Sequence, residues 1–428
     1  MARGTEASTS QRTLPLVAVG YGPRCVPVMQ LAEAAAGVCD LLWMIDGAQP
    51  GMPEMAELLQ RFGPVLDLSG LGVAQMATLL SAYEPDALVT YLDTGMVAYA
   101  ELAEALGLPF HSPATAAALT DKSRQRQVLG AAGLDMPPCH VVRPDQREGD
   151  LAHAVSEVGW PAILKPRSAQ GSRYTFLARD PTELDRLLTA LGPGRPDMVL
   201  EGYLADVPAR AAASYAAYVS VESVVASGVI SHLALTGRFP LAENFRETGF
   251  FIPAALEEGE QASVLALATA AIEALDIRIG CLHTEIKFTP GGPRLIEVNG
   301  RVGGGVPEML ERAAGIPLLE YTLRIGLGEE IRVSGPVATE RIGYRFFLQP
   351  PAVSATVAAI DGIDKVSDFP GVDTISVHHG PGADLDWRDG TRNHIMAVVG
   401  SAADYAELAA VNRLLLQEVT VTYADVKS

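Results

Sequence analysis

The chain has 428 residues, a length that fits two to four domains at about 100–200 residues each. Its composition, 48% hydrophobic and 19% charged, provides for a large core and excludes a disordered chain. The net charge of −19 argues against nucleic acid and anionic membrane surfaces as partners. An anionic small-molecule substrate would therefore need a locally basic site within an acidic protein.

No segment predicts a membrane span, a secretory signal or a disulfide framework. The apolar runs fall short of the ~18 residues that a membrane helix needs, and residues 1–13 lack the apolar stretch of a signal peptide. We expect those first residues to form a short tail. The cysteines form no CxxC pair and no metal-type spacing, which favours reduced thiols in a cytoplasmic protein. They are Cys25, Cys39, Cys139 and Cys281.

The N-terminal part of the chain alternates between apolar strands and helices. Continuous apolar runs are typical of buried parallel strands, and this alternation predicts an open α/β layer over residues 14–112. The GYGPR stretch after the first strand lacks the third glycine of a dinucleotide fingerprint, so it gives a nicotinamide site little support. The predicted strands are 14–20, 40–46 and 85–93, and the predicted helices are 26–37 and 95–109.

The rest of the chain predicts α+β structure in which strands dominate. A long helix is expected from Thr120 through DKSRQRQVLGAAG, and the apolar strand AILK ends at Lys165 before a Ser/Gly loop. No internal repeat or low-complexity tract occurs. Further strands are predicted in 197–205, 215–236, 342–351, 373–379 and 395–401, and further helices in 257–277 and 402–419.

A hairpin carries the most informative pattern. GCLHTEIKF (280–288) and RLIEVNGRVGGG (294–305) flank the turn sequence TPGGP. Alternation places Glu297, Asn299 and Arg301 on one face of the second strand. If the turn centres on Gly291, Glu285 lies opposite Glu297, and the residue two before Glu285 lies opposite Asn299. Directly opposed side chains lie roughly 4.5–5.5 Å apart at Cβ, where like charges destabilise the pair.

Two carboxylates so placed need either a shared proton or a cation between them. Glu285, Glu297 and the amide of Asn299 are hard ligands that suit Mg²⁺ or Mn²⁺ rather than zinc. A solvated hairpin face with incidental acids and a proton-sharing pair without metal are the alternatives. Because Mg²⁺ shares its shell with phosphates, Lys122 and Lys165 become candidate phosphate ligands, although lysines are commonly just solvated. The P-loop spacing GxxxxGK[ST] is absent.

Five motifs in chain order resemble those of the ATP-grasp superfamily: TDKSRQR, AILKPRSAQGS, LEGYL, HTEIKF and LIEVNGRVGGG. The resemblance covers residues 14–428, and HTEIK and NFRETGFFIPA resemble the branch that contains L-amino-acid ligases and carnosine synthase. It implies an α/β and α+β protein with three parts. These are an N-terminal α/β domain (14–112), an ATP-grasp core (113–325) with lobes at 113–204 and 205–325, and a C-terminal cap (326–428).

The resemblance also implies roles for particular residues. Lys122 and Lys165 would hold ATP phosphates, and the loop 168–173 would close over the triphosphate. Glu285, Glu297 and Asn299 would hold two Mg²⁺ ions, with Mn²⁺ as an alternative metal. Arg301 would stabilise an acyl phosphate and a tetrahedral intermediate. The remaining nucleotide-binding candidates are Ser168, Gly171 and Ser172 in the loop and Glu201, Gly202, Tyr203 and Leu204 in the adenine-binding hinge.

Other residues are candidates for the substrate end. His283 would orient or deprotonate the amine, or serve only structure. Glu222 would lie near the amino substrate or the metals, with a buried acid–arginine pair as the alternative. Arg246 and Glu247 lie on a predicted loop, where exposed charges are the default interpretation. The absence of side chains at Gly303, Gly304 and Gly305 would widen the acyl pocket or let the backbone approach the substrate.

These expectations favour an ATP-dependent carboxylate–amine ligase that forms an amide through an acyl phosphate and releases ADP and phosphate. Its partners would be a small-molecule carboxylate and an amine, of which one is an amino acid, and the superfamily is compatible with a homodimer. One alternative keeps the fold and changes the acceptor, as in a carboxylase or a ligase for a non-amino-acid amine. Alternatives of other classes are a non-catalytic nucleotide-binding regulator and a Rossmann dehydrogenase.

Overall fold

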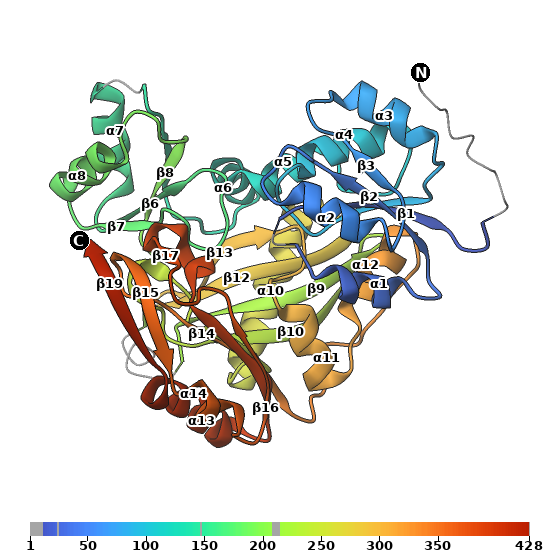
Figure 1. Ribbon diagram of the computed structural model, residues 1–428. Coiled ribbons are helices and arrows are strands. Elements are labelled where there is room, and N and C mark those ends of the chain that lie inside the picture. Colours follow the sequence, from blue (N-terminus) through green and yellow to red (C-terminus); the bar gives the residue numbers. More distant parts are fainter. Residues whose placement is uncertain (1–11, 24, 146–147, 208–214, 428) are drawn as a thin grey trace.

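The computed structural model describes residues 12–23, 25–145, 148–207 and 215–427 (Figure 1). The predicted tail at 1–13 therefore lies almost wholly outside the described residues. Three regions follow one another along the chain: an N-terminal layer in blue, a small lobe in cyan and green, and a large sheet that accounts for most of the rest. In the described ranges, no helix is both long and apolar enough to cross a membrane.

The N-terminal region is the predicted open α/β layer. Its sheet is parallel in the order β3-β2-β1-β4. Alternate residues of β1 and β2 belong to apolar clusters on opposite faces, which explains their uninterrupted apolar sequences. The sequence pattern missed β3, which is only three residues long and not fully buried. The elements are β1 Leu16–Gly20, α1 Val28–Ala35, β2 Asp40–Ile45, α2 Met52–Leu59, β3 Val65–Asp67, α3 Val73–Ser81, β4 Ala87–Thr90 and α4 Met96–Leu106.

The small lobe contains an antiparallel sheet in the order β5-β8-β6-β7. The helix predicted from Thr120 begins at Lys122, because Asp121 is extended and its side chain accepts a hydrogen bond from Arg124 N. Thr120 instead ends a preceding helix that the sequence pattern missed. The elements are α5 Pro113–Thr120, α6 Lys122–Ala131, β5 Cys139–Val142, α7 Glu148–Val158, β6 Ala162–Pro166, β7 Phe176–Ala178, α8 Pro181–Leu191 and β8 Met198–Gly202.

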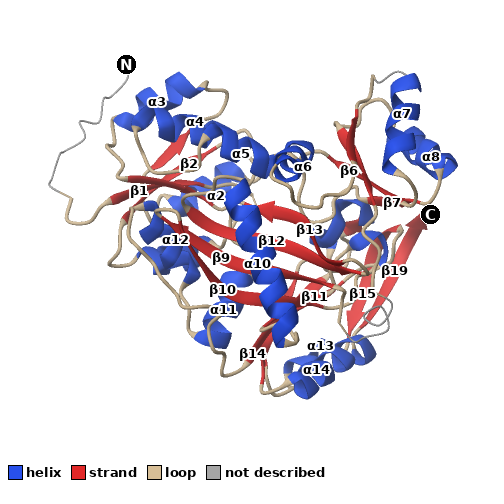
Figure 2. Cartoon of the chain, turned by 180° about the vertical axis from the view of Figure 1, so that it is seen from behind, coloured by secondary structure: helices blue, strands red, loops and turns tan. Residues whose placement is uncertain are grey.

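An antiparallel sheet of eight strands, β13-β12-β9-β10-β11-β14-β18-β16, forms the centre of the molecule. Helix α10 covers its apolar back face, which Figure 2 shows from behind. The valines at 219, 221 and 225 of β9 pack on that side. By alternation, Tyr218, Ser220 and Glu222 face the opposite side of the sheet. The elements are β9 Tyr218–Ala226, β10 Val229–Arg238, η1 Glu243–Phe245, β11 Gly249–Ile252, α10 Glu258–Ala274, β12 Gly280–Thr289, β13 Gly292–Asn299, α11 Val306–Ala314 and α12 Leu318–Gly326.

The C-terminal strands β14, β18 and β16 continue this same sheet beyond β11. A separate small sheet, β17-β15-β19, lies at the C-terminal end. The domain boundary at residue 326 stays a prediction. The elements are β14 Ile342–Leu348, β15 Ser354–Asp361, α13 Ile363–Ser367, β16 Val372–Val377, β17 Asp384–Leu385, η2 Trp387–Asn393, β18 Met396–Ala402, α14 Tyr405–Glu418 and β19 Thr420–Lys427.

The β12–β13 hairpin has the predicted register at its polar residues. Glu285 pairs with Glu297, and His283 pairs with Asn299. All four residues belong to the two strands at one edge of the eight-stranded sheet. The hairpin therefore brings the two acids side by side, as the spacing predicts.

The turn reaches this register by a different route from the predicted one. Thr289 pairs with Gly292, so the turn centre precedes Gly291, and a bulge at Ile296 restores the register. The bulge lets both Leu295 and Val298 join the apolar cluster under α10, although three positions separate them. A regular strand would place these two side chains on opposite faces.

Candidate active site

A cavity of about 830 Å³ lies between the small lobe and the front of the eight-stranded sheet. Its lining contains eight lysine and arginine residues against five glutamates, so it is a basic site in a chain of net charge −19. Four candidates lie outside the lining: Ser168, Glu222, Arg246 and Asn299. The predicted residues that line it are Lys122, Lys165, Gly171, Ser172, Glu201, Gly202, Tyr203, Leu204, Glu247, His283, Glu285, Glu297, Arg301, Gly303, Gly304 and Gly305.

The opposed acids of the hairpin are each paired with a cationic side chain. Lys122 Nζ donates to Glu297 Oε1 at 3.0 Å and to the Ala169 carbonyl at 2.8 Å. His283 Nε2 lies 3.5 Å from Glu285 Oε1. Burial favours the protonated form of Glu285, but His283 and nearby arginines outweigh it and lower its pKa to about 2. Glu285 is therefore ionised at neutral pH, which argues against a proton shared by the two acids.

Asn299 adds an amide oxygen beside these carboxylates. Its Nδ2 donates to the His283 carbonyl at 3.2 Å, and its Oδ1 accepts from Arg301 Nη2 at 3.2 Å. Among the described residues, no three His, Cys, Asp or Glu side chains converge as a metal site. Two carboxylates and one amide instead fit an ion that takes its other ligands from phosphate and water, as Mg²⁺ does.

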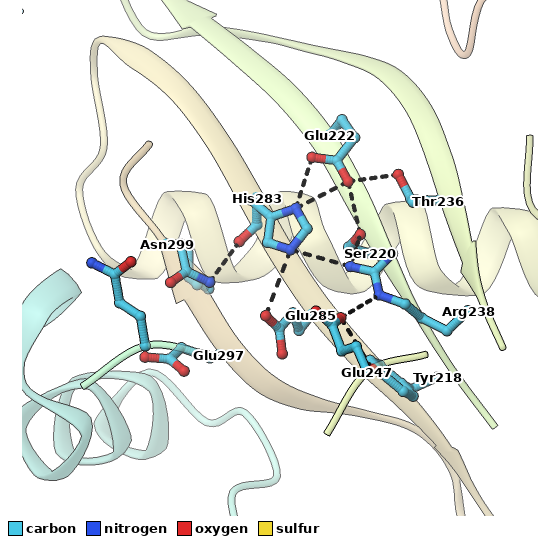
Figure 3. A network of polar contacts seen from close by, with 12 residues as sticks. Tyr218, Ser220, Glu222, Thr236, Arg238, Glu247, His283, Glu285, Glu297 and Asn299 are labelled. Atoms are coloured by element: carbon cyan, nitrogen blue, oxygen red, sulfur yellow. Dashed lines mark hydrogen bonds and ion pairs between the residues drawn. The ribbon is translucent and has the colours of Figure 1, made fainter. Parts of the chain in front are cut away.

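A buried polar network between β12 and the neighbouring strands β9 and β10 holds His283 (Figure 3). Its Nδ1 lies 2.9 Å from Glu222 Oε2, and Glu222 also accepts from two hydroxyls at 2.7 Å each. Its Nε2 lies 3.3 Å from Arg238 Nη2 and 3.5 Å from Glu285 Oε1. Nε2 can therefore accept from the guanidinium in the neutral ring or donate to the carboxylate in the protonated ring.

This network corrects the expectation for Glu222 and narrows that for His283. Glu222 is 1% exposed and pairs with a histidine rather than with an arginine. Burial disfavours a charged imidazole, but Glu222 and Glu285 outweigh it and raise the pKa of His283 to about 9. The contact of Nδ1 with Glu222 fixes the ring, which fits an orienting role, and deprotonation of the amine by His283 stays a prediction.

Lys165 and Arg126 share the buried carboxylate of Glu201. Arg126 Nε donates to Glu201 Oε2 at 3.1 Å, and Lys165 Nζ contacts Oε1. Burial favours protonated Glu201, but the two cations outweigh it and lower its pKa to about 2. The Glu201 side chain thus balances charge beneath the hinge. Sequence analysis missed Arg126, although it follows Lys122 by four residues and so shares its helix face.

The loop 168–173 contacts both η1 and the C-terminal region of the chain. Thr391 N donates to the Gly171 carbonyl at 2.9 Å, and Ser172 Oγ donates to a backbone carbonyl of η1 at 2.7 Å. The expectation that Ser168 binds the nucleotide is not met in this structure. Its Oγ donates to the Thr120 carbonyl at 2.8 Å, and the residue does not line the cavity.

Arg301 connects three parts of the chain. Its Nη2 lies 3.3 Å from Asp93 Oδ2, 3.5 Å from Gln170 Oε1 and 3.2 Å from Asn299 Oδ1. Sequence analysis missed Asp93 and Gln170. Asp93 nevertheless follows a strand of the parallel sheet at its carboxyl end, where ligands commonly bind in such folds.

Arg246 does not fit the predicted substrate role. It is 1% exposed, and it donates to the carbonyls of Glu243 at 2.9 Å and Pro350 at 2.8 Å, so it anchors its loop. The interpretation as an exposed loop charge is also wrong. Glu247 does line the cavity, where it accepts from Arg238 Nε at 3.0 Å.

The three glycines after Arg301 do not form one wide pocket. A Cβ on Gly303 would lie 2.6 Å from His283 Nδ1, and one on Gly305 would lie 3.1 Å from Arg345 Cδ. Gly305 also has a φ of +75°, which favours glycine. No atom lies within 4 Å of a Cβ on Gly304. Neighbouring side chains therefore fill two of the positions, and only the middle one is open.

Substituting Gly304 by tryptophan should narrow the cavity without backbone strain. We expect turnover of bulky acids to fall by about tenfold or more, which is about 1.4 kcal/mol, while the smallest acids react nearly as before. ADP release with acids of graded size measures this, and Gly259→Trp, at an exposed position with open surroundings, is the matched control. An unchanged size preference would contradict the assignment of Gly304 to the acyl pocket.

No protein-family model matches the chain. It is 27% identical over 285 residues to the uncharacterized protein y4rH of Sinorhizobium fredii, covering 65% of this chain and 56% of that protein. It is 27% identical over 265 residues to carnosine synthase 1 of Gallus gallus, covering 57% of this chain and 27% of that protein. The chain thus spans about half or less of these relatives.

Solved structures match almost the whole chain. An L-amino acid ligase from Bacillus licheniformis superposes with a TM-score of 0.76 at 20% identity, covering 96% of this chain and 99% of that one. An N5-carboxyaminoimidazole ribonucleotide synthetase from Thermus thermophilus gives 0.67 at 20% identity, covering 95% and 98%. These matches show that the chain shares the fold of both proteins, the ATP-grasp fold that the sequence motifs predicted.

Proposed function

We propose that this protein is an ATP-dependent ligase that joins a carboxylate to an amine and releases ADP and phosphate, with an amino acid as one substrate. The observation that carries the proposal is the opposed pair Glu285 and Glu297 at the wall of a basic cavity, with Asn299 buried two residues further along the same strand. The fold match to an L-amino acid ligase over 96% of the chain supports an amino acid as substrate.

The nucleotide would lie at the small-lobe end of the cavity. The hinge backbone at Gly202–Leu204, which lines the cavity, would contact the adenine edge. Lys122 and Lys165 each pair with a glutamate in this structure. A bound triphosphate would compete with these glutamates for both lysines. Mg²⁺ held by Glu285, Glu297 and Asn299 would neutralise charge on the transferred phosphoryl group.

The proposed reaction proceeds in two steps. A carboxylate oxygen of the acid attacks the γ-phosphorus of ATP, ADP leaves, and an acyl phosphate forms. The amine then attacks the carbonyl carbon, phosphate leaves with the former carboxylate oxygen, and the nitrogen loses a proton. Arg301 would stabilise the negative charge in both steps, and the loop 168–173 would exclude water.

Replacing Arg301 by methionine should lower kcat by about 10²–10³-fold, as is typical when a donor to a developing oxyanion is lost. Because Arg301 lies on the hairpin side of the cavity rather than at the hinge, the affinity for Mg·ADP should hardly change. Steady-state ADP release and calorimetric titration with Mg·ADP measure the two quantities. Arg332→Met, at an exposed position, is the control. Equal losses in binding and turnover would place Arg301 at the nucleotide instead.

The experiment that tests the function uses Mg·ATP with a pool of the common amino acids. We expect ADP, phosphate and new masses that correspond to amides. AMP would instead indicate an adenylating enzyme. A fold match to the biotin carboxylase domain of a 2-oxoglutarate carboxylase, in complex with MgADP and bicarbonate, supports a second candidate, a carboxylase, which would release ADP only when bicarbonate is present. Binding of Mg·ADP without any turnover would favour a non-catalytic regulator.

A further inference from the structure

Arg345 lies in the wall of the cavity beside the glycines that follow Arg301. It comes from β14, and its Nη1 would be 3.2 Å from a Cβ on Gly305. A side chain at position 305 would therefore occupy the space that the guanidinium now fills. Glycine at position 305 thus allows the guanidinium of Arg345 to approach the chain segment that follows Arg301.

The charge of Arg345 is weakly balanced by the protein. Its closest carboxylate is that of Glu308, with Nη1 and Oε2 3.6 Å apart, which is beyond hydrogen-bond length. Its Nε is buried and has no hydrogen-bond partner in the part of the chain that the structure describes. By contrast, Lys122 and Arg238 each donate to a glutamate at 3.0 Å. A bound acceptor that reaches this guanidinium would supply the missing hydrogen bond.

The surroundings of Arg345 favour an anion over a neutral group. Three histidines, at 378, 379 and 394, line the same cavity, and the guanidinium lies 5.5 Å from the centre of the Phe347 ring. Burial, with Arg345 and His379, lowers the pKa of His378, and burial lowers that of His394 to about 4, so these rings serve as neutral hydrogen-bonding groups and the positive charge is that of Arg345. The aromatic ring restricts the guanidinium to a plane, which suits two parallel hydrogen bonds to a carboxylate.

We propose that Arg345 binds a substrate carboxylate that does not react, so that productive substrates carry a free carboxylate besides the one that is activated. This inference rests on the proposed ligase function. Two sources have the required chemistry: the carboxylate of an amino acid that acts as the amine, and the second carboxylate of a dicarboxylic acid.

The test compares matched substrates on the wild type, Arg345→Gln and Arg345→Lys. Amino acids are compared with their carboxamides in one arm, and dicarboxylic acids of three to six carbons with their monoamides in the other. We expect Arg345→Gln to raise the KM of the carboxylate-bearing member at least tenfold in one arm, to leave kcat within threefold, and to spare the amide. Arg345→Lys should recover part of the loss, and Arg341→Gln, an exposed arginine just before β14, should match the wild type.

Each outcome decides the question. Selectivity in the first arm identifies the amine as the source of the carboxylate, and selectivity in the second identifies the acid. Equal KM values for both members of every pair in the wild type, or equal losses for both in Arg345→Gln, would overturn the proposal. If the wild type turns over no pair, the ligase function fails separately. The rise in the thermal midpoint caused by the same dicarboxylates and amino acids, with Mg·ADP present, then tests the subsite. A rise in the wild type that is lost in Arg345→Gln supports the proposal. No rise in the wild type overturns it.

Discussion

Replacing Glu297 by glutamine should lower ADP release by about a thousandfold or more, which is about 4 kcal/mol at 1.36 kcal/mol for each tenfold change. The amide keeps the shape of the side chain but removes its negative charge. That charge pairs with Lys122 and, together with Glu285, forms the proposed metal site. A metal site with one carboxylate in place of two has lost half of its charge. Steady-state ADP release over a range of Mg²⁺ concentrations measures the loss and any shift in metal requirement.

The fold should survive this substitution, because Lys122 keeps its hydrogen bond to the Ala169 carbonyl at 2.8 Å. Circular dichroism and the thermal midpoint of the variant check this point. Glu311→Gln, at an exposed position on α11, is the matched control and should retain wild-type turnover. Activity of Glu297→Gln within tenfold of the wild type, with an unchanged Mg²⁺ requirement, would show that the acid pair serves only structure.

Replacing Glu201 by glutamine should lower the free energy of unfolding by about 3–5 kcal/mol, the typical cost of removing one partner from a buried ionic group. Glu201 is 6% exposed and lies between Arg126 and Lys165, so the substitution leaves two buried cations without a counter-charge. Denaturant unfolding measures the loss. Glu157→Gln, which breaks an exposed pair with His140 in the same lobe, should cost less than about 1 kcal/mol.

The pH dependence of stability gives the same pair of variants a second test. The pKa of Glu201 is about 2 in the folded protein, below its ordinary value of 4.5. A lowered pKa means that the unfolded chain binds the proton more tightly, so the stabilisation is complete above pH 4.5 and declines as the pH falls toward 2. Glu201→Gln should lack this part of the acid sensitivity. A variant with wild-type stability and acid sensitivity would contradict the buried ionic group.

The sequence was most informative where alternation and a turn determine geometry. The spacing of Glu285 and Glu297 about Gly291 predicts their pairing, and the structure confirms it. The agreement depends on two features that offset each other, since the turn lies earlier than predicted and the bulge at Ile296 compensates. Leu295 and Val298 carry the signal for this bulge, because two buried apolar residues three apart do not fit regular alternation.

Other features depend on contacts between distant segments, which local patterns do not encode. Helix α5 was missed, and Thr115 within it donates to the carbonyl of the distant Leu275 at 3.1 Å. From the sequence, Arg246 is predicted to be an exposed loop charge. In the structure it donates to the carbonyls of Glu243 and Pro350. Arg345 fills the space beside Gly305. The two residues belong to distant segments of the chain, which only the strand order brings together.

The most direct measurement of the central claim follows a carboxylate oxygen. The acid identified in the substrate screen is labelled with ¹⁸O in its carboxylate and turned over with Mg·ATP and the amine, and the released phosphate is analysed by mass spectrometry. Phosphoryl transfer to the carboxylate predicts one ¹⁸O atom in each phosphate, alongside ADP. Unlabelled phosphate, or label found in AMP, would contradict the account.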